Sequence, residues 1–223
     1  MRVIKDKTGA ATQTINEYDI ASATAVVEGQ VVVLTLGKVV VAGVGVTTAI
    51  LGIAAESHSG SAADLNPRSD GLKIKVYDNP VAVYETEAIA LTATGGTTTT
   101  IIDTVSLSTS LADDDFIGGF AKLTYKGASS TNTDAVGTIY AISDSDTSSQ
   151  ELTIAEAGGA VTAGDKFVLF PPYAFAKGNL NAAVKGIVLT TIAAIPFKVV
   201  GRNENSETIE VYPTLHFYGN KNA

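Results

Sequence analysis

The stretch GQVVVLTLGKVVVAG, from Gly29 to Gly43, decides the fold that the sequence predicts. Two valine-rich runs are separated there by Leu36, Gly37 and Lys38. Valine is stiff at χ1 and fits a pleated, buried surface, and a glycine between two such runs permits a tight turn. We therefore expect a β-hairpin with buried strands.

The residues after this stretch continue the β-pattern. A third apolar run, AILGIAAES, covers residues 49–57, and LKIKVY alternates apolar and polar side chains over residues 72–77. Alternation with a period of two is typical of a strand with one buried face. The uncharged stretch from Val39 to Ala55 is shorter than the roughly 20 apolar residues of a membrane helix. We predict an all-β fold without a membrane span.

The sequence pattern changes at about residue 93, from long apolar runs to short strands with polar turns. The low-complexity segment TATGGTTTT leads into short strands separated by Asp-, Ser- and Gly-rich turns, and this set ends at a pair of prolines. Long apolar runs then return. We predict a β-barrel or sandwich base domain from residues 28–93 plus 173–223, with a second small β-domain inserted at residues 94–172.

The composition argues against several classes of function. Hydrophobic residues form 45% of the 223 residues, so a core can form. The net charge of −8 argues against a basic face for nucleic acid or for an anionic membrane. Cysteine is absent, which excludes disulfides, thiolate catalysis and cysteine-bound metals. The polar start RVIKDKTG does not have the apolar core of a secretion signal, and none is expected.

The sequence does not contain a recognisable catalytic motif. The two histidines, His58 and His216, have no partners at the spacing of a triad or a metal site, and we interpret them as surface or interface residues. No G-x-S-x-G elbow occurs, and GVGVTT at residues 43–48 lacks the ending of a phosphate-binding loop. We therefore predict a protein that is not an enzyme and that has no cofactor.

Acidic residues cluster in two segments of the predicted inserted domain, ADDDFIGGF (residues 112–120) and SDSDTSS (residues 143–149). Asp and Ser side chains accept backbone N–H bonds, so these segments are first interpreted as capped turns. The alternative is a calcium site, which requires the two segments to meet in space. We predict no metal site, and the candidates for one would be Asp113, Asp115, Asp144 and Asp146.

Aromatic residues could provide a sugar-binding face. The chain has no tryptophan, however, and the aromatic residues of the predicted insertion lie at β spacing. We expect these residues in the core, namely Phe116, Phe120, Tyr125 and Tyr140.

Two stretches resemble head proteins of tailed phages. EGQVVVLTLGKVVVAGVGVTTAILGIAAES, followed by LKIKVYDNPVAVYE, resembles the β-domain of capsid decoration (cement) proteins and related head structural proteins. The resemblance lies in the G-x-V-V-x-L and G-K-V-V strands, the LGIAAE run and the VYDNP segment. Residues 97–170 are similar to a small β-module of phage structural proteins, in which a threonine-rich strand leads to DDDFxGG and later to AGDxF.

This resemblance implies a non-enzymatic virion component that binds and stabilises the outside of an icosahedral capsid. The implied partner is the major capsid protein, and the implied state is a homotrimer or other homo-oligomer without direct contact with nucleic acid or membrane. Its implied location is the capsid surface of a virion assembled in the host cytoplasm. A phage tail or head-fibre subunit and a glycan- or receptor-binding module stay open as alternatives.

The N-terminal residues provide the predicted contacts. Residues 1–27 show neither a helical stripe nor a long alternation, and we predict an extended N-terminal arm. Such arms become ordered when they bind and wrap neighbouring subunits. We expect capsid or subunit contacts at Arg2, Ile4, Ile15 and Tyr18.

Overall fold

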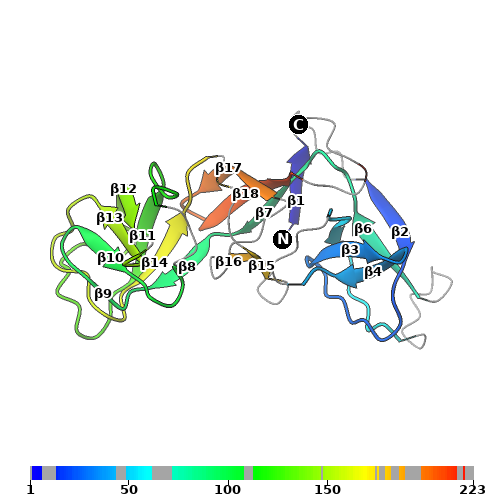
Figure 1. Cartoon of the computed structure of the whole chain (residues 1–223), viewed down its shortest axis with the longest axis horizontal. Coiled ribbons are helices and arrows are strands. Elements are labelled where there is room, and N and C mark those ends of the chain that lie inside the picture. The colour runs from blue at the N-terminus through cyan, green and yellow to red at the C-terminus, as the bar shows by residue number, and fades with distance from the viewer. Residues whose placement is uncertain are drawn as a thin grey trace.

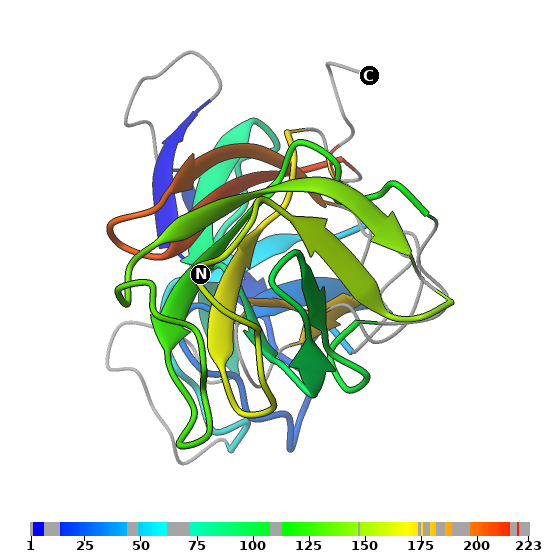
Figure 2. The same cartoon turned by 90° about the vertical axis from the view of Figure 1, so that its left-hand side faces the viewer.

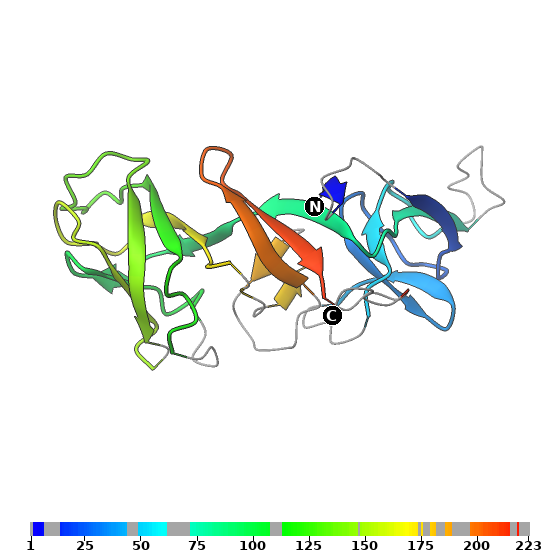
Figure 3. The same cartoon turned by 90° about the horizontal axis from the view of Figure 1, so that it is seen from above.

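The computed structural model describes residues 2–6, 14–43, 49–61, 72–107, 113–146, 148–173, 175, 179–181, 186–188, 197–214 and 218. All regular elements within these ranges are β-strands, which confirms the predicted all-β fold. The strands form sheets of seven, five, four and two strands. Figures 1 and 3 show the three larger sheets in a row along an elongated molecule. The described part of the chain contains no helix that could cross a membrane.

The hairpin predicted from the opening stretch is present. β3 (Val31–Thr35) pairs with β4 (Lys38–Val41) across a turn of two residues, Leu36 and Gly37. Both turn residues have positive φ, 51° and 77°. Positive φ at both positions is the signature of a type I′ turn, whose twist matches that of the flanking strands.

This hairpin belongs to a five-stranded sheet with the order β2-β6-β5-β3-β4. Its end strands meet, because Ile20 forms a parallel bridge with Val39 of β4. The sheet therefore curls into a barrel, which we call the first barrel. The other strands are β2 (Ile15–Asp19), β5 (Gly52–Ala54) and β6 (Lys73–Tyr77). The side chains that fill its interior are those of Ile20, Val26, Val32, Val39, Leu51, Ala54, Ile74 and Val76.

The valine run of β3 is buried on both faces of the barrel wall. Val32 packs in the barrel interior, whereas Val31 and Val33 belong to the core that contains Tyr84 of the neighbouring sheet. A strand buried on both faces needs apolar side chains at successive positions, which explains the continuous run in the sequence. At position 52 the barrel wall accepts only glycine, because a Cβ atom there would lie 1.9 Å from the carbonyl oxygen of Tyr77.

A four-stranded antiparallel sheet, the central sheet, follows the first barrel along the molecule (Figure 1). Its order is β1 (Arg2–Asp6), β7 (Ala82–Glu87), β18 (Thr208–Pro213) and β17 (Phe197–Asn203). The Tyr84 and Phe197 rings meet edge to face, with centres 6.3 Å apart. The two-stranded hairpin of β15 (Asn179–Asn181) and β16 (Gly186–Val188) lies next to β7.

The seven-stranded sheet forms a second barrel, which Figure 2 turns toward the reader. Its first and last strands, β8 and β9, are consecutive in the chain. The two residues that connect β8 to β9 bond to opposite sides of the sheet. The N–H of Ala93 donates to the carbonyl of Asp165 and the N–H of Thr94 to the carbonyl of Ile102, each at 2.8 Å. The segment from β8 to β9 therefore closes the sheet into a barrel. In order, the strands are β8 (Ile89–Thr92), β14 (Lys166–Phe170), β11 (Phe120–Tyr125), β12 (Ile139–Asp146), β13 (Glu151–Ile154), β10 (Thr100–Ile102) and β9 (Gly95–Gly96).

Buried carboxylates hold the loops of the second barrel. Asp165 is fully buried and accepts the N–H of Gly127 at 2.7 Å, the N–H of Thr162 at 3.0 Å and the hydroxyl of Ser130 at 3.1 Å. Asp103, also buried, accepts backbone N–H bonds from Thr92, Val105 and Ser106. These two aspartates therefore satisfy backbone N–H groups of the turns.

The predicted arm and the predicted base domain each contribute strands to more than one sheet, and the domain division itself stays a prediction. The sheet of the second barrel includes β8, at residues 89–92, in addition to strands within the predicted insertion at 94–172. The predicted arm, residues 1–27, contains β1 of the central sheet and β2 of the first barrel. The predicted base residues 28–93 and 173–223 share the central sheet through β7 and β18, whereas β2 to β6 form the first barrel.

Candidate functional site

The acidic turn at residues 113–119 lies against β12 of the second barrel. The N–H of Asp114 donates to the carbonyl of Ser145, and that of Gly118 to the carbonyl of Ile142, each at 3.1 Å. Phe116 is buried, and its ring stacks on Phe175 with centres 5.2 Å apart. The turn is therefore anchored in the core by Phe116, as predicted from the sequence.

This packing brings the two acidic segments together through Asp114 and Asp144. The carboxyl groups of these residues are hydrogen bonded to each other. Desolvation raises the pKa of Asp114, and the bond to Asp144 and the charges of Asp144, Asp113 and Asp115 raise it further. Of the three aspartates in this turn, only Asp113 and Asp115 were metal candidates from the sequence. Asp114 makes the contact instead, because its φ of 68° turns the chain there, a conformation that aspartate tolerates.

Asp146 takes part in a local turn instead. Its carboxylate accepts the N–H of Ser148 at 2.8 Å, the hydroxyl of Ser148 at 2.7 Å and the N–H of Ser149 at 3.3 Å. These bonds, first that of the Ser148 hydroxyl, lower the pKa of Asp146. Across the described ranges, no group of three or more His, Asp and Glu side chains is arranged to hold a metal ion. A metal role for the candidates Asp113, Asp115, Asp144 and Asp146 is not tested by this arrangement, and the prediction of no metal site stays a prediction.

The interpretation of His58 as a surface or interface residue is wrong. Its side chain is buried in the first barrel, and Nδ1 accepts the N–H of Gly60 at 2.8 Å. The backbone of His58 bridges that of Val26, so this apparently loop-like segment is part of the barrel wall. The Ser- and Gly-rich sequence around His58 is typical of a loop and gave no sign of this pairing. His216 lies outside the described residues.

A second polar cluster lies where the first barrel meets the central sheet. Asp78 is buried in the connection between β6 and β7, and its Oδ2 accepts the Tyr18 hydroxyl and the Asn16 amide, the latter at 2.8 Å. The Tyr18 hydroxyl also lies 2.7 Å from that of Tyr218. The cluster joins β2, the β6–β7 connection and the C-terminal region. Asp78, which lies in the VYDNP segment, was not predicted as a site residue from the sequence.

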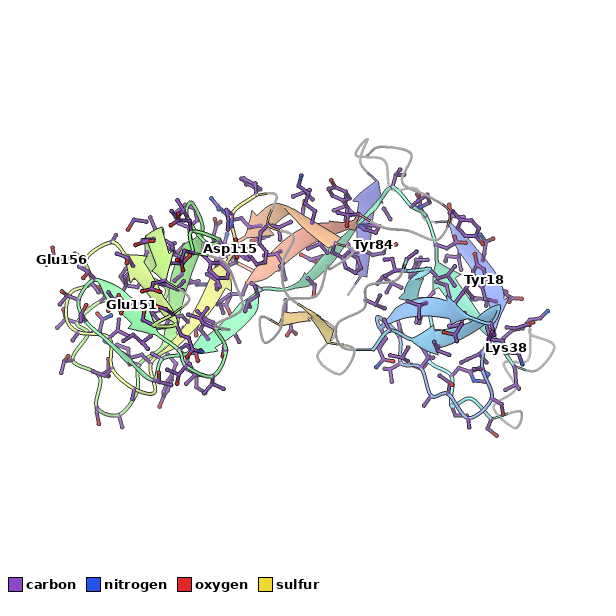
Figure 4. The ribbon with its side chains drawn as sticks, in the orientation of Figure 1. Tyr18, Lys38, Tyr84, Asp115, Glu151 and Glu156 are labelled. Carbon is purple, nitrogen blue, oxygen red and sulfur yellow. The ribbon has the colours of Figure 1, made fainter. Side chains whose placement is uncertain are left out.

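The phenols near Asp78 are held in the neutral form. Desolvation and then the hydrogen bond to Asp78 raise the pKa of Tyr18 far above its usual range. Burial and then the charge of Asp78 do the same for Tyr84, and Figure 4 labels both tyrosines. Neutral phenols donate hydrogen bonds but are poor nucleophiles, so this cluster is suited to holding chain segments together.

The predicted contact residues divide between two sheets. Arg2 and Ile4 lie in β1, the end strand of the central sheet, where Arg2 is opposite Glu85. Ile15 and Tyr18 lie in β2 of the first barrel; Ile15 is exposed and Tyr18 half-buried. A contact role for these four residues stays a prediction.

The aromatic residues expected in the core differ in burial. Phe116 and Tyr140 are buried and Phe120 is half-buried. The expectation for Tyr125 is wrong, because this side chain is exposed, with the Lys166 ammonium 5.5 Å from its ring centre. The register between β11 and β14 shifts between Leu123 and Tyr125, which explains why strand alternation misplaced this ring.

Comparison of the chain with protein-family models, with curated proteins and with solved structures found no match.

Proposed function

We propose that this chain is a non-enzymatic virion structural protein that binds and stabilises the outside of an icosahedral phage capsid. The observation that carries the proposal is the elongated arrangement of the molecule, with the two barrels at opposite ends of the central sheet (Figure 3). One end of such a molecule can contact a lattice while the other end projects from it. The sequence resemblance to capsid decoration proteins supports the same function.

A rigid body suits this function. One apolar core includes Ile53 of the first barrel, Tyr84 and Phe197 of the central sheet, and Phe170 of the second barrel. Because cores are close-packed, the three units hold a defined position relative to one another. A shell stabiliser acts by mass action, since binding the assembled lattice better than free subunits shifts the equilibrium toward assembly. It requires a contact surface and no reacting groups.

Charge also supports a location outside the shell. The net charge of −8 disfavours attachment to nucleic acid, which a protein of a DNA-filled particle must avoid. The partner in this proposal is the major capsid protein. Several copies of the chain, as a homotrimer or other homo-oligomer, would occupy equivalent positions on the particle surface.

Co-sedimentation tests this proposal. Purified chain is mixed with empty shells of the phage that encodes it, and the bound copies per shell are counted by quantitative gel. We expect saturable binding at a fixed stoichiometry and a higher melting temperature of the shells. Electron microscopy of the particles then locates the density. No binding to shells, or density confined to the tail, would overturn the proposal, and the second result would identify a tail subunit.

A further inference from the structure

Leu36 has an unusual position at the tip of the β3–β4 hairpin. Its side chain is 99% exposed, the largest exposure among the described large hydrophobic residues. Its φ is 51°, in the left-handed region. Single exposed leucines are common on protein surfaces, but a leucine that is both fully exposed and left-handed is not.

The hairpin itself would be more stable with another residue at this position. Type I′ turns prefer asparagine followed by glycine, because asparagine adopts positive φ at a lower free-energy cost than leucine. Gly37 already provides the second residue of that preferred pair. Within the described residues, Leu36 makes no core contact that would compensate for its backbone conformation. The folded monomer therefore gains nothing from leucine here.

The tip is presented by a rigid element at one end of the molecule. Thr35 and Lys38 pair directly on either side of the turn, and Val32, Val33 and Val39 are buried in the barrel wall. Figure 4 places Lys38, next to the tip, and Glu156 of the second barrel toward opposite ends of the molecule. A side chain on such a tip is preorganised, so ordering it on binding costs little entropy.

We propose that Leu36 is a docking residue that enters an apolar socket on the outer surface of the capsid shell protein. This inference rests on the proposed function and specifies which end of the molecule contacts the shell. A protruding apolar side chain requires a concave apolar partner surface. Lys38, exposed beside the tip, favours acidic side chains at the rim of that socket.

Leu36→Asn is the decisive variant, because its two expected effects have opposite signs. Asparagine adopts positive φ at a lower free-energy cost than leucine, so the melting temperature of the free chain is expected to rise by about 2 °C or more. Loss of the buried leucine side chain is expected to weaken binding to empty shells by about tenfold to a hundredfold. Leu36→Met keeps an apolar side chain and is expected to retain most of the binding. Val105→Asn removes another exposed side chain, on the second barrel, and is the matched control.

Each result separates this inference from the proposed function. If the wild-type chain does not bind shells, the proposed function and the docking role both fail. If wild type and Leu36→Asn bind equally, only the docking role of Leu36 is overturned. Mass photometry of the free chains completes the test, because a wild-type oligomer that dissociates in Leu36→Asn would assign Leu36 to self-association and would also overturn it.

Discussion

The guanidinium of Arg202 lies 4.0 Å from the centre of the Phe120 ring and 5.3 Å from that of Tyr173. Arg202 belongs to β17 of the central sheet and Phe120 to β11 of the second barrel. Beside this stack, the Lys122 ammonium of β11 lies 2.8 Å from a carboxylate oxygen of Glu207. The β17–β18 hairpin is thus attached to the second barrel by a cation–π contact and an ion pair.

Replacing Arg202 by alanine tests this attachment. We expect Arg202→Ala to lower the free energy of unfolding by about 1–2 kcal/mol, because the guanidinium is partly desolvated between two rings. Urea unfolding followed by circular dichroism measures the change. Lys198→Ala, on the same strand, is the control and is expected to change stability by less than about 0.5 kcal/mol. Equal stability of Arg202→Ala and wild type would mean that the cation–π contact does not stabilise this attachment.

The arrangement of the strands was predictable where a local pattern determines it. The Leu36–Gly37 turn and the buried valines of β3 follow from residues adjacent in the sequence. Burial of Phe116, a large apolar ring within the acidic turn, was also predicted from the sequence.

Long-range pairing was not predictable in the same way. Ile20 pairs with Val39, His58 with Val26, and Asp78 receives its donors from β2. Nothing in the residues around His58 or Asp78 indicates which distant strand will cover them. Burial of these polar side chains is decided by barrel closure, which depends on contacts across tens of residues.

Tyr18→Phe tests the cluster around Asp78. The change removes a hydroxyl donor from a buried carboxylate, and we expect a loss of about 1–3 kcal/mol in the free energy of unfolding. Tyr218→Phe is the matched comparison, because it leaves the bond between Tyr18 and Asp78 in place and is expected to cost less. Chemical denaturation of both variants measures the difference. A larger loss in Tyr218→Phe would show that the Asp78 bond is not the main interaction of Tyr18.

Tyr140 predicts how stability responds to alkaline pH. Burial, together with its bond to Asp134, raises the pKa of Tyr140 to about 12. An unfolded tyrosine loses its proton near pH 10, so the unfolded state binds fewer protons than the folded state above this pH. The stabilising contribution of protonated Tyr140 to the free energy of unfolding is complete below about pH 10 and is lost as the pH rises toward about 12.

Denaturant unfolding at pH 9 to 12 measures this effect. Between pH 10 and 12, the stability of Tyr140→Phe is expected to fall less steeply than that of wild type, by about 1.4 kcal/mol per pH unit for one proton. Tyr125→Phe, at an exposed ring, is expected to keep the wild-type slope. Parallel curves for wild type and Tyr140→Phe would contradict the raised pKa.

The bond between Asp114 and Asp144 makes a prediction of the same sign at acidic pH. The folded protein holds the Asp114 proton more tightly than the unfolded chain does, since desolvation and the neighbouring carboxylates raise this pKa. Its favourable contribution is therefore complete below the usual aspartate pKa of about 3.9 and is lost as the pH rises through the raised value. At pH 7 the carboxylates repel one another, so we expect Asp114→Asn to raise the melting temperature at pH 7.

The same variant should leave the melting temperature unchanged at pH 3, where Asp114 is protonated in both states. Asparagine tolerates the φ of 68° as well as aspartate does, so the backbone adds no effect of its own. Asp113→Asn removes a charge that acts on Asp114 only through space, and a smaller rise is expected. Scanning calorimetry with and without calcium completes the test. A calcium-dependent rise in wild type that Asp114→Asn abolishes would mean that these carboxylates bind a cation, and the repulsion argument would then fail.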